Sequence, residues 1–200
     1  MTESFMNLWH PIASSEDLPY RHIFQGQLLG RELAVWRADD DFVNVWENRC
    51  LHRGLRLSIG RNDGLELRCQ YHGWRYANRS AGCTYIPAHP ADAPARTICN
   101  RTFPSVERYG LIWSGEEPTG EPPEIAALEN AETLLLRNIA VNAPLNLVLG
   151  HLANYRFSIT GDPDNLATTS MDYQDECSLS LTATCDGKES TVVFFVQPVD

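Results

Sequence analysis

The chain has 200 residues, a formal net charge of −10, 43% hydrophobic residues and 21% charged residues. That length suits one large domain or two small ones, and the composition is that of an ordinary soluble globular protein. The negative charge argues against nucleic acid or an anionic membrane as a partner. No apolar run approaches the roughly 18 residues that span a membrane, and the N-terminus lacks the features of a signal peptide. We therefore expect a cytoplasmic protein.

Short strands separated by turns dominate the first part of the sequence. The expected strands span residues 8–13, 21–28, 31–38, 42–47, 57–59, 65–67, 74–76 and 108–114. A helical turn over residues 14–18 is expected to begin at an N-cap formed by Ser14 or Ser15. Frequent turns and scarce helical periodicity predict an all-β sandwich.

The stretch from Gly115 to Pro123 is rich in Pro, Gly and Glu, which is typical of a linker. We therefore predict a first domain at 1–115, a linker at 116–123 and a second domain at 124–200. In the second domain we expect a helical turn at 124–129 and a helix at 146–157. Three strands are expected at 134–141, 179–184 and 191–196. Because the sequence stops just past an apolar strand, we expect an incomplete α+β domain whose antiparallel sheet is either cut short or completed by other means.

Two cysteine–histidine pairs lie close together in the first domain. They are Cys50-x-His52 and Cys69-x-x-His72, with sixteen residues between His52 and Cys69. The turn Asn62-Asp63-Gly64 lets the chain double back, so that two neighbouring loops each supply one thiolate and one imidazole. Two thiolates on one iron and two imidazoles on the other form the ligand set of a Rieske [2Fe–2S] centre. We predict that these four residues bind such a cluster.

A structural zinc site is the alternative use of two cysteines and two histidines. Zinc ribbons usually write their ligand pairs as C-x-x-C or H-x3-5-H, a spacing that this sequence lacks. The remaining cysteines are scattered and show no disulfide framework, so we expect plain thiols at Cys83, Cys99, Cys177 and Cys185.

The two motifs resemble the Rieske domain of Rieske non-haem iron oxygenases, which are terminal components of ring-hydroxylating dioxygenases and of O- and N-demethylases. The resemblance rests on Cys50-x-His52-Arg53-Gly54 and Cys69-x-Tyr71-His72-Gly73-Trp74, and it covers roughly residues 7–115. Rieske proteins of respiratory complexes carry an extra cysteine in each loop, and the two cysteines form a disulfide. This chain has no such cysteines. Without that disulfide and with few further donors to the sulfurs, we expect a potential in the lower part of the Rieske range.

The resemblance implies an oxidoreductase that passes electrons toward O2-dependent hydroxylation or demethylation of a small organic substrate, for instance an aromatic one. It further implies an NADH-dependent flavin and ferredoxin reductase as electron donor, and a homotrimer. Arg53 and Trp74 are expected to shape the rim of the cluster and a docking surface. The acidic chain as a whole favours a basic electron-donor protein.

An oxygenase of this family also needs a mononuclear Fe(II) held by two histidines and one carboxylate. The family writes the histidines as H-x4-5-H, but here His151 stands alone, and residues 155–157 are Tyr, Arg and Phe. A single histidine makes a weak iron site, so an ordinary structural role is expected for His151. Three explanations stay open: a fragment lacking a rearranged catalytic half, a subunit that has lost its oxygenation site, and a divergent site.

The sequence therefore predicts a Rieske-type monooxygenase or dioxygenase component, with its mononuclear iron site not supported in this chain. The alternative is a Rieske ferredoxin-like electron carrier, or an oxygenase subunit without its own mononuclear iron.

Overall fold

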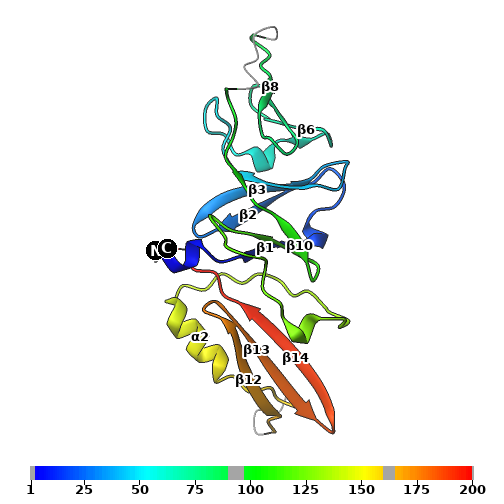
Figure 1. The fold of residues 1–200 in the computed structure, drawn as a ribbon, viewed down its shortest axis with the longest axis vertical. Coiled ribbons are helices and arrows are strands. Elements are labelled where there is room, and N and C mark those ends of the chain that lie inside the picture. Colours follow the sequence, from blue (N-terminus) through cyan, green and yellow to red (C-terminus); the bar gives the residue numbers. More distant parts are fainter. Residues whose placement is uncertain (1–2, 90–96, 160–164, 200) are drawn as a thin grey trace. The chain divides into compact units, whose positions relative to one another are not determined.

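The computed structural model describes residues 3–89, 97–159 and 165–199, which form a mainly β protein (Figure 1). The chain divides into two compact units, one spanning Met1–Pro122 with Val199–Asp200 and the other spanning Pro123–Pro198. The strands of the described part form four antiparallel sheets, so the mainly β fold predicted from the sequence is confirmed. No helix in the described ranges is long and apolar enough to cross a membrane.

Two sheets of the first unit enclose one hydrophobic core. Their strand orders are β2-β3-β4-β9 and β1-β11-β10. These strands are β1 (His10–Ser14), β2 (Ile23–Leu28), β3 (Arg31–Arg37), β4 (Val43–Glu47), β9 (Thr102–Phe103), β10 (Val106–Arg108) and β11 (Leu111–Ser114). Leu33 and Val35 of β3 pack in this core with Ile112 of β11. The short helix α1 (Glu3–Met6) precedes β1, and the 3-10 turn η1 (Ser15–Asp17) follows it, with Ser14 as the predicted N-cap.

A third sheet of the first unit has the order β5-β6-β7-β8. Its strands are β5 (Arg61–Asn62), β6 (Glu66–Arg68), β7 (Arg75–Ala77) and β8 (Cys83–Tyr85). Leu67 and Tyr76 of this sheet are buried in a second core, together with Trp36 and Trp46 from β3 and β4. Strand β3 thus turns alternate residues into two different cores, which explains why its central residues are all buried.

Several elements of the first unit differ from the sequence prediction. Residues Leu57–Ile59 form the 3-10 helix η2 and not a strand. The single strand expected at 108–114 is two strands, β10 and β11, joined by a turn in which Tyr109 and Gly110 have φ of 58° and 70°. Strands β8 and β9 were not predicted, because runs of three and two residues are too short to show an alternating pattern.

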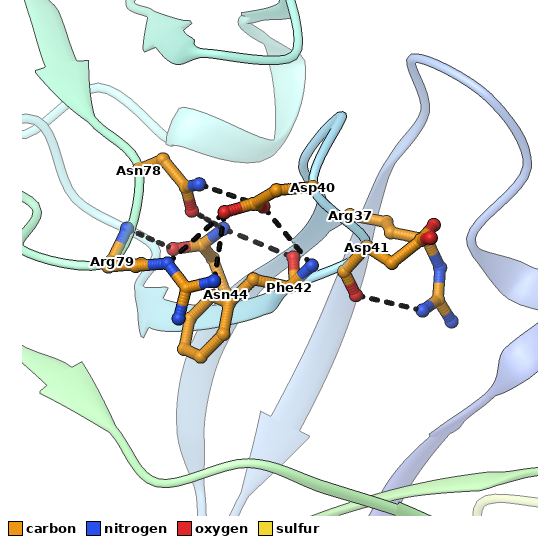
Figure 2. Close-up of polar contacts among 7 residues, drawn as sticks. All are labelled: Arg37, Asp40, Asp41, Phe42, Asn44, Asn78 and Arg79. Atoms are coloured by element: carbon orange, nitrogen blue, oxygen red, sulfur yellow. Dashed lines mark hydrogen bonds and ion pairs between the residues drawn. The ribbon is translucent and has the colours of Figure 1, made fainter.

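A polar network joins the turn after β3 to the turn after β7 (Figure 2). The buried Asn44 donates from Nδ2 to Asn78 Oδ1 at 2.8 Å and accepts from the Arg79 backbone N–H at 2.8 Å. Asp40 in turn accepts from Asn78 Nδ2 at 3.0 Å and from Arg79 Nη2 at 2.9 Å. These contacts link the turn after β7 to strand β4 and to the turn that precedes it.

The second unit contains one helix, one 3-10 turn and a three-stranded meander in its described residues. These elements are η3 (Ala126–Leu128), α2 (Leu145–Ala153), β12 (Thr168–Asp175), β13 (Ser178–Cys185) and β14 (Lys188–Phe195). The predicted hairpin at Asp186-Gly187 is confirmed, with φ of 50° and 72° at the two turn residues. Strand β12 was not predicted.

The prediction of a strand at 134–141 is wrong. These residues belong to no helix or strand, and Leu134, Leu136 and Ile139 are exposed. Apolar residues alone could not form a strand here, because in the described part of the chain no partner strand pairs with this segment.

Candidate metal centre

Two loops with the same backbone closure carry the predicted ligands. The first follows β4, and the second joins β6 to β7. In the first, Cys50 N–H donates to Leu55 O at 2.8 Å, and Gly54 N–H donates to Cys50 O at 2.8 Å. In the second, Cys69 N–H donates to Trp74 O at 2.8 Å, and Gly73 N–H donates to Cys69 O at 3.2 Å.

Both loops turn at a glycine in the left-handed region. Gly54 and Gly73 each have φ of 71°, a conformation that glycine adopts without steric strain. The two motifs therefore fold alike, although one is written C-x-H and the other C-x-x-H.

The structure brings the four predicted residues together as two pairs. Cys50 and Cys69 are buried, and the two thiols lie close enough for each to shift the pKa of the other. The rings of His52 and His72 lie side by side, with centroids 4.8 Å apart, and both residues are exposed. The ring of Trp74 stacks on His52 at a centroid distance of 4.9 Å and an interplanar angle of 2°. The thiol pair thus lies inside the protein and the imidazole pair at its surface.

The interaction between the two thiols shifts their pKa values in opposite directions. The interaction with Cys69 and, to a smaller extent, the Tyr76 hydroxyl lower the pKa of Cys50 to about 5, against the effect of burial. The same interaction raises the pKa of Cys69. One thiolate therefore forms readily at neutral pH, and thiolate is the form in which cysteine binds metals.

Tyr76 is a neighbour of the site that the sequence analysis missed. Its hydroxyl lies 3.2 Å from Cys50 Sγ and accepts from the Leu51 backbone N–H at 3.1 Å. Burial and the bond to Cys50 raise the pKa of Tyr76, so the hydroxyl keeps its proton and donates it toward sulfur. The expectation of few donors to the sulfurs overlooked this bond. The available signal was the strand alternation of residues 74–76, which turns Tyr76 inward beside the second loop.

The donor set fits a binuclear cluster better than a single ion. In residues 3–89, 97–159 and 165–199, no three His, Cys, Asp or Glu side chains gather around one point that suits a metal ion. A tetrahedral zinc site would need such a group. A Rieske [2Fe–2S] cluster needs only two protein ligands per iron, with bridging sulfide between the irons. Two separate pairs of side chains meet that requirement.

Two further histidines lie away from the loops. His10 is buried, and its Nε2 lies 2.9 Å from the carbonyl of Phe5, a contact typical of a structural histidine. His151 lies near the end of α2, in a shallow pocket lined otherwise by apolar residues of the second unit, including Val141, Leu147 and Leu152.

Comparison with known proteins identifies the first unit. A family model described as Rieske [2Fe-2S] domain matches residues 8–107, which include both loops and most strands of that unit. A [2Fe–2S] cluster is the cofactor that such a domain carries.

Curated relatives extend the likeness to components of oxygenase systems. The oxidoreductase NdmD of Pseudomonas putida is 47% identical over 156 residues, which are 76% of this chain and 26% of that protein. The methylxanthine N1-demethylase NdmA of the same species is 33% identical over 148 residues, 71% of this chain and 41% of that protein. This chain therefore spans less than half the length of either relative.

A solved structure shows that the likeness of fold covers both units. The structure of Pseudomonas putida NdmA matches 99% of this chain and 70% of its own, with a TM-score of 0.80 and 22% identity. Taken with the family match over half of the residues and the paired loops of the first unit, this makes the chain a member of the Rieske [2Fe–2S] family that is related to Rieske oxygenase components.

Proposed function

We propose that Cys50 and Cys69 bind one iron of the cluster and that His52 and His72 bind the other. The observation that carries this assignment is the pairing itself: two buried thiols and two adjacent imidazoles on loops with matching closure. When bound, a [2Fe–2S] cluster supplies reversible one-electron transfer. The exposed histidine rings give an electron a short path to the protein surface, while the buried thiols are kept from solvent.

The chain would then be the terminal oxygenase component, or a part of it, in a system that oxidises a small organic substrate. Its relation to the demethylase NdmA supports this role. In this proposal residues 1–115 are the Rieske domain, 116–123 a linker and 124–200 a partial catalytic-type domain. An NADH-dependent flavin and ferredoxin reductase supplies electrons, and three copies assemble. A cytoplasmic location suits the cluster ligands, which must stay reduced thiols.

A specific observation favours the second candidate, an electron carrier or a subunit without its own mononuclear iron. The oxidoreductase NdmD shares more identity with this chain than the demethylase NdmA does, over a similar length. In addition, the pocket at His151 presents no carboxylate and no second histidine among its lining residues.

The EPR spectrum of the protein treated with nitric oxide separates the two candidate functions. The protein is loaded anaerobically with Fe(II), reduced and exposed to nitric oxide, and its EPR spectrum is recorded. An oxygenase with its own site gives a mononuclear iron–nitrosyl signal that His151→Ala abolishes. The control variant His22→Ala removes an exposed histidine of the first unit and leaves the signal intact. Absence of the signal in the unsubstituted protein, beside a normal Rieske signal, establishes the carrier.

A further inference from the structure

The charge of this chain is distributed very unevenly. Between residues 49 and 75, six arginines stand against two acids, which gives this segment a formal charge of +4. The chain as a whole has a net charge of −10. The segment contains both ligand loops, so positive charge is concentrated around the proposed cluster.

Three of these arginines occupy matching positions on neighbouring strands. Arg61 of β5 pairs in register with Arg68 of β6, and Arg68 pairs with Arg75 of β7. Residues paired in this way point to the same face of a sheet, with Cβ atoms about 5 Å apart. The next positions on the same strands are buried, so the three arginines point outward. We call this set the arginine ladder.

The arginine ladder is not explained by a stabilising effect on the sheet. Like charges directly opposite each other on adjacent strands destabilise a sheet. Arg75 has compensation from Glu66, at 3.7 Å, and from the ring of Tyr85, at 5.0 Å. Arg61 and Arg68 are exposed and take part in no ion pair within the described ranges. Two neighbouring guanidinium groups are therefore left open to an external anion.

The ladder borders the ligand loops. A Cβ atom on Gly73, the residue after His72, would come within 3.4 Å of Arg68 Nε and Nη2, so this guanidinium lies against the second loop. On the first loop Arg53 is exposed next to His52. Each loop also exposes one large apolar side chain, Leu51 at 46% and Tyr71 at 57%. Apolar residues at the centre with arginines around them are typical of protein-binding surfaces.

We propose that Arg53, Arg61 and Arg68, with Leu51 and Tyr71, form the docking surface for an electron-transfer protein whose own docking face is rich in carboxylates. This inference rests on the proposed function, because docking here brings a donor next to His52 and His72. Salt screens charges beyond about 8 Å at physiological ionic strength, so a compact partner responds to the local positive charge. A long polyanion such as nucleic acid also meets the acidic remainder of the chain and is repelled. One electron passes from the reduced partner to the oxidised cluster, with no bond made or broken.

The test uses the cluster-loaded protein and an acidic plant-type [2Fe–2S] ferredoxin as probe. Binding is measured by calorimetry, and electron transfer from the reduced ferredoxin is followed by stopped-flow absorbance at several salt concentrations. The variant Arg61→Gln/Arg68→Gln is compared with Arg137→Gln/Arg156→Gln. The second variant removes the same charge from exposed arginines of the second unit, in which Arg156 donates only to backbone carbonyls.

We expect the ladder variant to bind about tenfold more weakly and to accept electrons about tenfold more slowly at low salt. Its rate should also depend less on salt, while its reduction potential and EPR spectrum match those of the unsubstituted protein. Equal losses in both double variants, or no loss in either, would overturn the docking surface. Binding of a short DNA duplex that needs the ladder, without ferredoxin binding, would overturn the choice of partner. A missing Rieske signal would reject the proposed function alone, since calorimetry still decides on docking.

Discussion

Tyr76 connects the hydrophobic core of the first unit to a proposed ligand sulfur. Its ring is fully buried beside Leu67, and its hydroxyl contacts Cys50 Sγ at 3.2 Å. Hydrogen bonds to cluster sulfurs are among the factors that set the potential of iron–sulfur centres. Since reduction adds negative charge to the cluster, a donor to sulfur stabilises the reduced form more than the oxidised form.

The substitution Tyr76→Phe is therefore expected to lower the reduction potential while the cluster remains bound. A typical hydrogen bond makes a net contribution of about 0.5–1.5 kcal/mol, which corresponds to a one-electron shift of roughly 20–65 mV. An EPR-monitored redox titration measures the shift. Tyr71→Phe is the matched control, because Tyr71 is exposed and its substitution should leave the potential unchanged. An equal shift in both variants would exclude a specific role for the Tyr76 hydroxyl.

At the residue scale, sequence reasoning found what depends on short spacing and missed what depends on packing. Cys50 and His52 are two positions apart in the sequence, so their spacing alone suggests metal ligands. Tyr76 stands 26 positions after Cys50 in the sequence, and the pairing of β6 with β7 places it near this cysteine. No local pattern records such a contact.

Among the elements, the contact between the β5–β8 sheet and strand β4 includes one buried side-chain amide beside the hydrophobic core. Asn44 is 1% exposed, and both ends of its side chain are used, one by Asn78 and one by the backbone of Arg79 (Figure 2). A buried polar group that loses its partner destabilises a fold more than an exposed ion pair stabilises it.

We therefore expect Asn44→Ala to lower the free energy of unfolding of the cluster-loaded protein by about 1–3 kcal/mol. Asp40→Asn disrupts the exposed pair with Arg79 in the same network and should lower it by less than about 1 kcal/mol. Chemical denaturation followed by circular dichroism measures both changes. A larger effect from Asp40→Asn would show that the ion pair, and not the buried amide, contributes more to the contact between the β5–β8 sheet and strand β4.

The turn between β12 and β13 contains a thiol that resists ionisation. Burial, together with the charges of Asp175 and Glu176, raises the pKa of Cys177 to about 12. In the unfolded chain a thiol ionises near pH 8.5. The folded state therefore holds the proton more tightly, and its stabilising effect is full below about pH 8.5 and is lost as pH rises toward 12.

Cys177→Ala should remove this part of the alkaline destabilisation. Between about pH 8.5 and pH 11 the unsubstituted protein loses up to about 3 kcal/mol of stability through this group, and the variant does not. Denaturation midpoints across that pH range give the comparison. The control Cys99→Ala removes an exposed thiol and should retain the pH dependence. Parallel pH profiles for Cys177→Ala and the unsubstituted protein would contradict the assignment.

At the scale of elements, alternation predicted best the strands that follow one another through tight turns. Strands β2, β3 and β4 follow one another through tight turns, and the sequence places them within two residues. Leu134 to Val141 shows a similar apolar pattern but has no partner strand in the described part of the chain. Leu57 to Ile59 is also apolar, yet only Leu57 is buried and the segment closes as a 3-10 helix. Sheet formation depends on a partner strand, which a local pattern does not specify.

For the whole molecule, the net charge and the local charge near the proposed cluster favour different partners. The chain is acidic, and this favoured a basic electron donor, but the segment around the proposed cluster is basic. Charges act over about a Debye length, so their position outweighs their sum. The pairing of Arg61 with Arg68 depends on the register of β5 and β6, which the sequence alone does not set.

The central claim is that this chain holds a [2Fe–2S] cluster through two cysteines and two histidines. The most direct measurement is iron and acid-labile sulfide per chain, together with the EPR spectrum of the reduced protein. We expect two irons, two sulfides and a rhombic Rieske signal, all lost in Cys50→Ser and all kept in Cys99→Ser. Zinc without sulfide in the purified protein, or a normal cluster in Cys50→Ser, would contradict the claim.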